Sequence, residues 1–185
     1  TPGLRPDMPG IVKAVENGAV LTSEMEVFFD VCPCKIIAVT GSDGKTTTTT
    51  IVSELLKKAG YNVHVGGNIG TPLLTKADSM KKGDMVVLEL SSFQLMTMTK
   101  SPDIAVITNL APNHLDVHKD MDEYVEAKKN IFLHQGENGV LVLNLDNDIT
   151  NKFTGNGRTY FFSRKKKVES GFYCDGGVIY SSFNG

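Results

Sequence analysis

The sequence has 185 residues, of which 41% are hydrophobic and 22% charged, and its formal net charge is −2 at pH 7. A chain of this length can bury a core and corresponds to one domain, with room for a fragment of another. The charge leaves no basic surface for nucleic acid, and no apolar run approaches the roughly 20 residues that cross a bilayer, so we expect neither a nucleic-acid partner nor a membrane.

The first half of the chain shows a strand, a helix and a second strand. Residues 35–40 (KIIAVT) predict a buried strand. Residues 45–59 predict a helix, and Gly60 is its expected stop. Residues 62–65 predict a short strand.

The second half continues the alternation. Residues 84–90 and 103–108 are near-continuous apolar runs, which are typical of strands covered on both faces. A predicted helix over 120–135 precedes another buried strand over 139–144. From residue 158 onward the apolar runs are short and separated by turns, which predicts a small antiparallel patch. The alternation as a whole predicts an α/β fold with a mostly parallel sheet and flanking helices.

The cysteines and the chain ends bear on cellular context. Cys32, Cys34 and Cys174 are odd in number, and further zinc ligands are missing near the Cys-Pro-Cys pair, so we expect free thiols. No charged-then-apolar leader opens the chain. A cytoplasmic location is therefore expected. Thr1–Leu4 is a turn sequence with no element before it, and the chain closes directly after a strand-like run, so we expect a piece of a longer protein.

Polar or glycine residues end the predicted strands. They are Thr40-Gly41, Glu89, Thr108-Asn109 and Asn144. In an open parallel sheet, ligands bind outside the carboxyl ends of the strands. We therefore expect these groups to meet at one edge, with Asn144 and Asp146 as weaker candidates for contacts to a nucleotide.

A phosphate-binding loop is predicted between the first strand and the first helix. Its residues are Gly41, Ser42, Asp43, Gly44, Lys45, Thr46 and Thr47. Glycines let the backbone wrap an anion, which the N–H groups at the helix N-terminus then bind. Lys45 can reach the β and γ phosphates, and the Thr46 hydroxyl can bind Mg²⁺. The pattern is the short form G-x-x-G-K-T, because Val39 stands where the longer form has glycine; the alternative is a glycine-rich turn without a ligand.

Three further side chains are candidates for chemistry. Glu89 is an acid inside an apolar strand, and a buried carboxylate must be paired or bound to a metal; it could also be a capping or salt-bridge acid. His114 lies in a loop and could be a plain surface residue. Lys128 falls within the apolar stripe of its helix, so it either extends its stem to solvent or is a partly buried amine with a lowered pKa.

A family resemblance joins these features. The short loop pattern is similar to that of the Mur ligases and the related folylpolyglutamate synthetases. Further segments resemble Mur ligase motifs in the family's order: 65–72 (VGGNIGTP), 88–95 (LELSSFQL), 108–116 (TNLAPNHLD), 124–128 (YVEAK) and, at the front, 1–4 (TPGL). The ELSSFQL segment is the most specific of them and is typical of the members that add D-glutamate.

The resemblance implies roles for these residues. Lys45, Glu89, His114 and Lys128 would be catalytic; ATP would bind at 41–47; and two Mg²⁺ ions would be held by Thr46, Glu89, His114 and Lys128. Lys128 would carry a carbamate formed from CO₂. Asn68, Ser91 and Gln94 would face the muramoyl substrate. Asn113 stands where the family usually has Asp, which puts a carboxylate role at that position in doubt.

The implied reaction is ATP-dependent ligation of D-glutamate to UDP-N-acetylmuramoyl-L-alanine through an acyl phosphate. The implied organisation is a tail of the N-terminal UDP-substrate domain over 1–30 and an incomplete ATP-binding domain over 31–185, without the C-terminal ligase domain. The isolated chain would then bind Mg²⁺-ATP weakly without turnover. The alternatives are a folylpolyglutamate synthetase-like ligase, a phosphate-loop kinase or NTPase, and a non-catalytic nucleotide-binding module.

Overall fold

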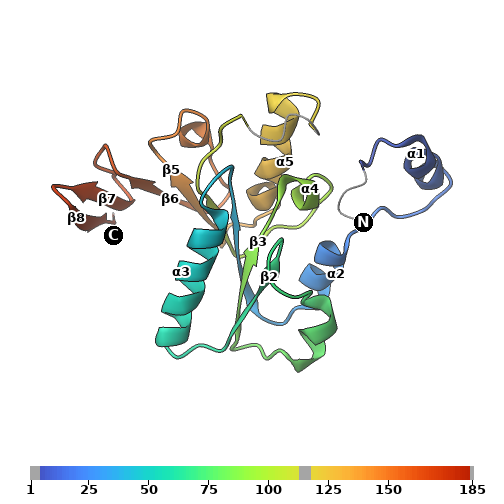
Figure 1. Cartoon of the computed structure of the whole chain (residues 1–185), viewed down its shortest axis with the longest axis horizontal. Helices are drawn as coiled ribbons and strands as arrows, with labels where there is room; N and C mark the ends of the chain where they lie inside the picture. The colour runs from blue at the N-terminus through green and yellow to red at the C-terminus, as the bar shows by residue number, and fades with distance from the viewer. Residues whose placement is uncertain (1–4, 113–117, 184–185) are drawn as a thin grey trace.

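The protein forms one sheet with helices on both faces, described here in a computed structural model that covers residues 5–112 and 118–183. The sheet has eight strands in the order β2-β3-β1-β4-β5-β6-β7-β8 (Figure 1). Their bounds are β1 Lys35–Thr40, β2 Val63–Gly67, β3 Met85–Glu89, β4 Ile104–Ile107, β5 Val140–Asn144, β6 Arg158–Ser163, β7 Gly171–Asp175 and β8 Val178–Ser182. The predicted α/β class and each predicted strand up to residue 144 are confirmed.

The strand pairing is parallel from β2 through β7. Among the strands of the described residues, β7 and β8 are the antiparallel pair, joined by the turn at Gly176 and Gly177. The antiparallel patch predicted from residue 158 is therefore correct for the last hairpin and wrong for β6, which pairs in parallel with β5. A parallel pair needs a crossover, and the segment 145–157 with its short 3₁₀ turn provides one between β5 and β6.

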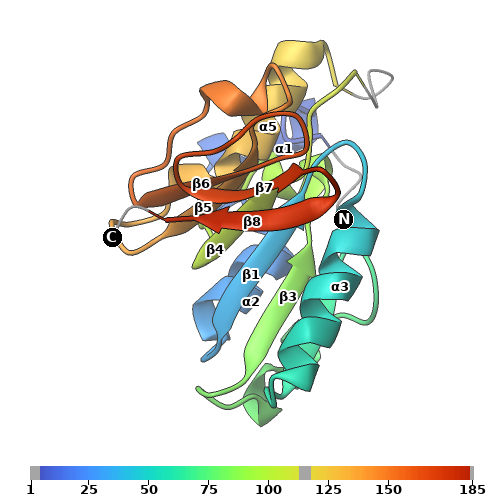
Figure 2. The same ribbon diagram turned by 90° about the vertical axis from the view of Figure 1, so that its left-hand side faces the viewer.

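The helices cover the two faces unequally. Figures 1 and 2 show α3 against one face and α2, α4 and α5 against the other. The helical segments are α1 Pro9–Glu16, α2 Glu24–Val31, α3 Lys45–Lys58, α4 Ser92–Leu95 and α5 Met121–Leu133, with 3₁₀ turns η1 Leu74–Ser79 and η2 Thr150–Lys152. No helix of the described residues is long and apolar enough to span a bilayer.

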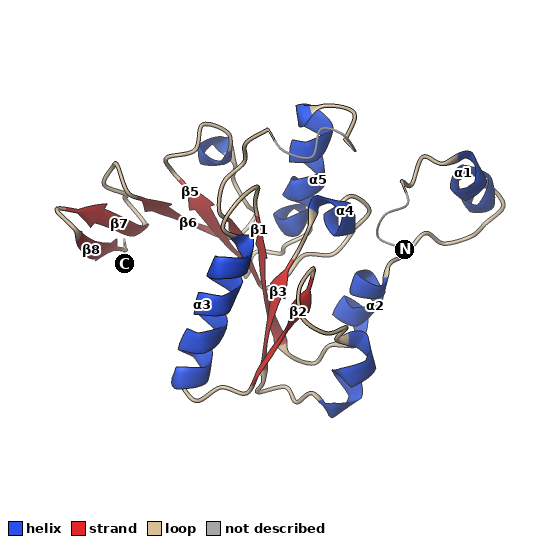
Figure 3. Ribbon diagram, viewed as in Figure 1, coloured by secondary structure: helices blue, strands red, loops and turns tan. Residues whose placement is uncertain are grey.

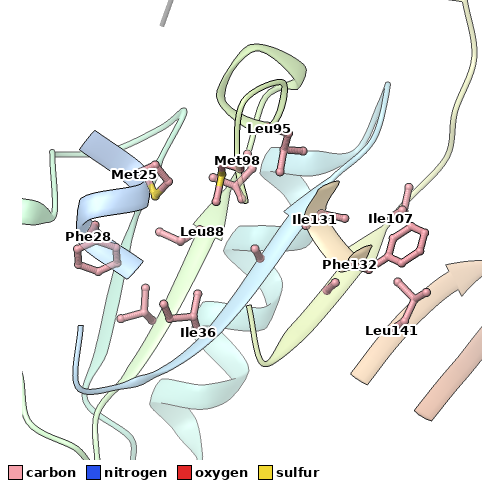
Figure 4. Packing of buried hydrophobic residues seen from close by; sticks show 14 of the residues in the cluster. Met25, Phe28, Ile36, Leu88, Leu95, Met98, Ile107, Ile131, Phe132 and Leu141 are labelled. Carbon is pink, nitrogen blue, oxygen red and sulfur yellow. The ribbon is translucent and has the colours of Figure 1, made fainter. Parts of the chain in front are cut away.

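The largest hydrophobic core lies on the face covered by α2, α4 and α5. Alternate residues of β1 divide between the faces, because successive strand side chains point in opposite directions: Ile36 and Ala38 belong to this core, whereas Ile37 and Val39 are buried outside it. Figure 4 shows side chains that the helices contribute, namely Met25, Phe28, Leu95, Ile131 and Phe132, together with Met98, which follows α4. Burying each such side chain contributes about 1.5–3 kcal/mol, so this face fixes the strands whose ends form the site.

The N-terminal segment contacts the rest of the chain through α2 and through ion pairs of Arg5 and Asp7. Ser23 caps α2 by accepting from the Glu26 N–H, and the buried Glu26 carboxylate accepts from the backbone N–H and the hydroxyl of Thr99. Helix α1 lies farther out (Figure 3), and every one of its residues is at least partly exposed. Residues 5–31 thus attach to the sheet domain at α2 and, near their start, through the pairs of Arg5 with Glu123 and of Asp7 with Lys119.

Candidate functional site

The phosphate loop leaves the carboxyl end of β1, a central strand with neighbours on both sides. Gly41 has φ 148°, and a Cβ there would lie 1.9 Å from Thr108 Oγ1. Gly44, with φ 77°, then starts α3 in the left-handed conformation. The loop therefore has its two glycines where a side chain would collide with β4's end or strain the backbone.

Ser42 is held from three sides. Its N–H donates to Asn109 O (2.9 Å), and its hydroxyl contacts Ala111 O and the Tyr124 hydroxyl, each at 2.9 Å. Ser42 is buried. Tyr124 is buried beside it, and its own burial raises the pKa of the Tyr124 hydroxyl. Tyr124 therefore remains a neutral hydrogen-bonding group and ties the loop to α5. Ser42, a predicted nucleotide-binding residue, thus stabilises the phosphate loop through these hydrogen bonds.

Asp43 is fixed by the residues that follow β4. Its N–H donates to Asn109 Oδ1 (2.9 Å), and its carbonyl accepts from the Thr108 hydroxyl (2.6 Å). The predicted convergence of Thr108-Asn109 with the loop is therefore confirmed. These contacts order the backbone N–H groups at the start of α3, which is the arrangement that binds phosphate.

Lys45 and Thr47 complete the loop at the first turn of α3. Lys45 Nζ donates to Gly41 O (3.1 Å) and Ser42 O (3.0 Å), so the ammonium lies over the loop. Thr47 is exposed in the same turn. A lysine ammonium in this place puts a positive charge beside an anion bound at the helix N-terminus.

Glu89 and Thr46 come together at the end of β3. Glu89 is 2% exposed, and its Oε2 accepts from the Thr46 hydroxyl at 2.6 Å. Its Oε1 accepts from Asn68 Nδ2 at 3.0 Å. A buried carboxylate costs free energy unless it is hydrogen-bonded, and here a hydroxyl and an amide satisfy it. The carboxylate therefore faces the first turn of α3, directly after the phosphate loop.

Lys128 is buried beneath the loop, with 2% of its surface exposed. Its Nζ donates to Thr40 Oγ1 (3.1 Å) and lies 4.9 Å from the centroid of the Tyr124 ring. Burial, helped by the charge of Lys45 and opposed by Glu89, lowers the pKa of Lys128 to about 7. The lysine does not extend to solvent; within the described residues it makes no salt bridge to a carboxylate.

The donor set fits Mg²⁺ in part. Hydroxyl and carboxylate oxygens are the ligands that Mg²⁺ prefers beside phosphates, and Thr46 and Glu89 offer one of each within 2.6 Å of one another. His114 and Asn113 lie outside the described residues. Within 5–112 and 118–183, no group of three or more His, Cys, Asp or Glu side chains is placed to hold a metal.

One of the three predicted substrate residues, Gln94, lines a pocket. Ser91 and Gln94 form a capping box at the start of α4, in which the Gln94 side chain accepts from the Ser91 N–H (3.0 Å). Gln94 also lines a cavity of about 560 Å³ between the N-terminal segment and the sheet domain, with Arg5, Leu21, Met25, Gly67 and Phe93. Asn68 is next to Gly67 but turns its amide to Glu89. The structure thus brings Asn68 to Glu89 and Gln94 to the pocket.

Comparison with known families decides the assignment. The family model described as the Mur ligase middle domain matches residues 39–178. The chain belongs to the Mur ligase family. The match spans the sheet from β1 to the start of β8, including the phosphate loop, Glu89 and Lys128.

Relatives and solved structures agree with this. The UDP-N-acetylmuramoylalanine–D-glutamate ligases of Acetivibrio thermocellus and Ruminiclostridium cellulolyticum are 61% and 56% identical over 92% and 100% of this Mur ligase chain. The chain spans 37% and 40% of the length of those relatives. The MurF ligase of Thermotoga maritima in complex with ADP matches at TM-score 0.61 and 26% identity, over 85% of this chain and 39% of that one. MurF from Acinetobacter baumannii matches at TM-score 0.59 and 22% identity, over 78% of this chain and 34% of that one, and shows the fold.

Sequence reasoning missed several residues of this Mur ligase site. Thr40, which holds Lys128, was noted as a strand end without a role, and its own hydroxyl donates to Leu90 O (2.7 Å). Arg5 lines the pocket and forms a two-pronged ion pair with Glu123. The Arg5–Glu123 contact joins residues 118 positions apart, which no local pattern indicates.

Proposed function

We propose that the full-length protein is an ATP-dependent ligase that adds D-glutamate to UDP-N-acetylmuramoyl-L-alanine in peptidoglycan precursor synthesis. The carrying observation is the convergence of Lys45, the Thr46–Glu89 pair and the buried Lys128 around one phosphate loop. A plain phosphate-loop NTPase needs the first two but has no use for a buried amine there. The names and identities of the relatives support the choice of substrates.

The reaction would form an amide in two steps. A carboxylate oxygen of the muramoyl substrate attacks the γ-phosphorus of ATP, and ADP leaves. The amine of D-glutamate then attacks the acyl carbon, loses a proton, and inorganic phosphate leaves. The N–H groups of the loop and the ammonium of Lys45 would hold the phosphoryl group and stabilise its charge in the first step. The ADP in the Thermotoga maritima MurF complex supports a nucleotide at this loop.

The family resemblance suggests which residues would hold Mg²⁺. Two ions would be held by Thr46, Glu89, a modified Lys128 and His114, the last of which lies outside the described residues. Bound Mg²⁺ neutralises phosphate charge beside the reacting group. An amine buried against Thr40 and without a carboxylate partner in the described chain is suited to reaction with CO₂, and the carbamate would supply an anion where a dication must lie.

The pocket would receive the muramoyl part of the substrate. Gln94 lines it, and Asn68 and Ser91 lie at the neighbouring strand ends. Residues 1–30 would then be the tail of the UDP-substrate domain and 31–185 the ATP-binding domain, because the pocket lies between these two parts. The free thiols suit a reducing cytoplasm. The 185-residue chain alone would bind Mg²⁺-ATP weakly and not turn over.

Phosphate release by the full-length protein tests the ligase. The assay contains ATP, Mg²⁺ and UDP-N-acetylmuramoyl-L-alanine, with and without D-glutamate. We expect release that needs both substrates and disappears in Lys45→Ala. Lys152→Ala, which removes a lysine from the 3₁₀ turn η2, is the matched control and should leave the rate unchanged. Release that ignores both substrates would reduce the protein to a generic NTPase.

Intact-mass measurement tests the carbamate. A mass increase of one CO₂ that disappears in Lys128→Ala, together with rescue of that variant by added acetate, would support it. An unmodified lysine in fully active protein would rule it out.

A further inference from the structure

His118 is a buried residue that the proposed chemistry leaves unused. It is 2% exposed and lies between two aromatic rings, stacked on Phe93 (ring centroids 5.6 Å apart) and edge-on to Tyr124 (5.2 Å). Its Nε2 is 2.9 Å from the Ser92 hydroxyl, which is also buried. A buried polar ring is retained at a cost in desolvation, so these contacts call for an explanation.

The surroundings select one form of the ring. Burial lowers the pKa of His118, so the imidazole is neutral near pH 7. Its Nδ1 lies 3.4 Å from Glu123 Oε2. A lone pair facing a carboxylate would be repelled, so the proton belongs on Nδ1 and Nε2 accepts from Ser92.

The contacts of His118 join both sides of the site. On the side of α4 lie Ser92 and Phe93, and Phe93 is part of the pocket wall together with Gln94. On the side of α5 lies Tyr124, which binds Ser42 of the phosphate loop and is one turn from Lys128. Glu123, which faces His118, also binds Arg5 of the pocket through 2.8 and 3.2 Å hydrogen bonds.

We propose that His118 is a positioning residue: by accepting from Ser92 and filling the space between Phe93 and Tyr124, it holds the pocket wall of α4 in place against α5. The inference rests on the proposed function for the identity of the pocket's substrate. We assign His118 no catalytic role, because its ring is 2% exposed and packs between Phe93 and Tyr124. Its loss should weaken binding of the muramoyl substrate and leave ATP binding intact, since Tyr124 keeps its own bond to Ser42.

Steady-state kinetics of the full-length protein give the first test. His118→Phe keeps a ring between Phe93 and Tyr124 and removes the acceptor, and Ser92→Ala removes the donor. Each should raise KM for the muramoyl substrate roughly tenfold and leave KM for ATP within about twofold, because one buried hydrogen bond is lost. The double variant should be no worse than either single one. His118→Gln, which can place an amide oxygen near the Nε2 position, should restore part of the loss.

The matched control is His134→Phe, which changes an exposed histidine at the C-cap of α5. It should leave both KM values unchanged. A fall in kcat alone in His118→Phe, or equal changes in both KM values, would mean that His118 merely stabilises the fold, and the proposal would be wrong.

Nitrogen-15 NMR of the wild-type and variant proteins separates this inference from the proposed function. We expect the His118 ring to show the Nδ1–H tautomer, and both His118→Phe and Ser92→Ala to shift the amide signals of Ser91 and Gln94 while those of α3 stay in place. Shifts confined to residues around 118 would overturn the positioning role. If the wild-type assay shows no need for the muramoyl substrate, the proposed function fails, and the NMR result still decides the role of His118.

Discussion

The phosphate loop is held by hydrogen bonds to neighbouring strand ends, whereas the pocket beside it depends on contacts that helices, loops and the N-terminal segment make with one another. Ser42, Asp43 and Thr46 are bound by residues that directly follow β4 or end β3. The pocket wall, in contrast, is fixed by the Arg5–Glu123 ion pair and by His118. The parallel order of the strands is enough to bring the residues around the phosphate loop together. The residues of the pocket wall come together only when the N-terminal segment packs correctly against the sheet domain.

Substitution of Gly41 should have the largest effect, because Gly41 lies in the phosphate loop, where Thr108 leaves no room for a Cβ. In Gly41→Ala the new Cβ would lie 1.9 Å from Thr108 Oγ1, at φ 148°. We expect a loss of about 3 kcal/mol in the free energy of unfolding, together with loss of Mg²⁺-ATP binding. Chemical denaturation and calorimetry measure the two quantities.

Gly60→Ala is the matched control for this substitution. Gly60 follows α3 at φ 92°, with nothing within 4 Å of the added Cβ. Only the left-handed backbone is strained there, at a cost of about 1 kcal/mol, and nucleotide binding should persist. Equal losses in the two variants would show that steric contact with Thr108 is not what makes Gly41 necessary.

Replacement of Lys128 by methionine should have an intermediate effect. It should abolish ligation but increase the stability of the folded protein at pH 7. The pKa of Lys128 falls from 10.5 to about 7 on folding, so between these values the unfolded chain holds a proton that the folded chain releases. Wild-type stability should therefore rise as pH increases from about 7 to 10.5.

Lys128→Met should remove this slope and be the more stable protein at pH 7, while ligation is lost. Denaturation in CO₂-free buffer at a series of pH values measures the slope, and phosphate release measures activity. A wild-type curve that is flat over this range would contradict the burial of a free amine.

Replacement of Glu123 by glutamine should have the smallest effect on stability and a specific effect on the pocket. The hydrogen bond from Arg5 lowers the pKa of Glu123 to about 2 from 4.5. Its stabilising contribution is thus present above about pH 4.5 and is lost as pH falls towards 2. The pair is partly exposed, so the change in melting temperature should be small.

Amide exchange in residues 5–31 should nevertheless become faster in Glu123→Gln, because the N-terminal segment loses its ion pair to α5. Glu54→Gln breaks the exposed Lys57 pair within α3 and is the control that should leave this segment unchanged. Faster exchange in both variants would indicate a general loss of stability instead.

The contrast between the phosphate loop and the pocket also explains which features could be predicted from the sequence. The apolar runs predicted β1, β3, β4 and β5, and helical periodicity placed Lys128 on the buried face of α5, which the structure confirms. Short apolar runs after residue 158 did not reveal that β6 pairs in parallel with β5, because pairing direction depends on the crossover and not on the strand itself.

Most of the pocket could not be predicted from local sequence patterns. Gln94 could be proposed from a motif, but its capping box with Ser91 could not be distinguished from a substrate contact. His118 and Arg5 carry no periodic signal, and their partners Ser92 and Glu123 lie 26 and 118 residues away. The roles assigned to Asn68, Ser91 and Gln94 in substrate binding stay predictions, as does that of His114.

The central place of β1 has a consequence for how the protein opens. Local unfolding starts at edges and exposed segments and reaches the middle strands last. Ala38 and Val39 are fully buried between β3 and β4, so exchange of their amide hydrogens should require global unfolding. The phosphate loop begins where this strand ends and therefore keeps its shape through the partial openings that would release α1 and α2.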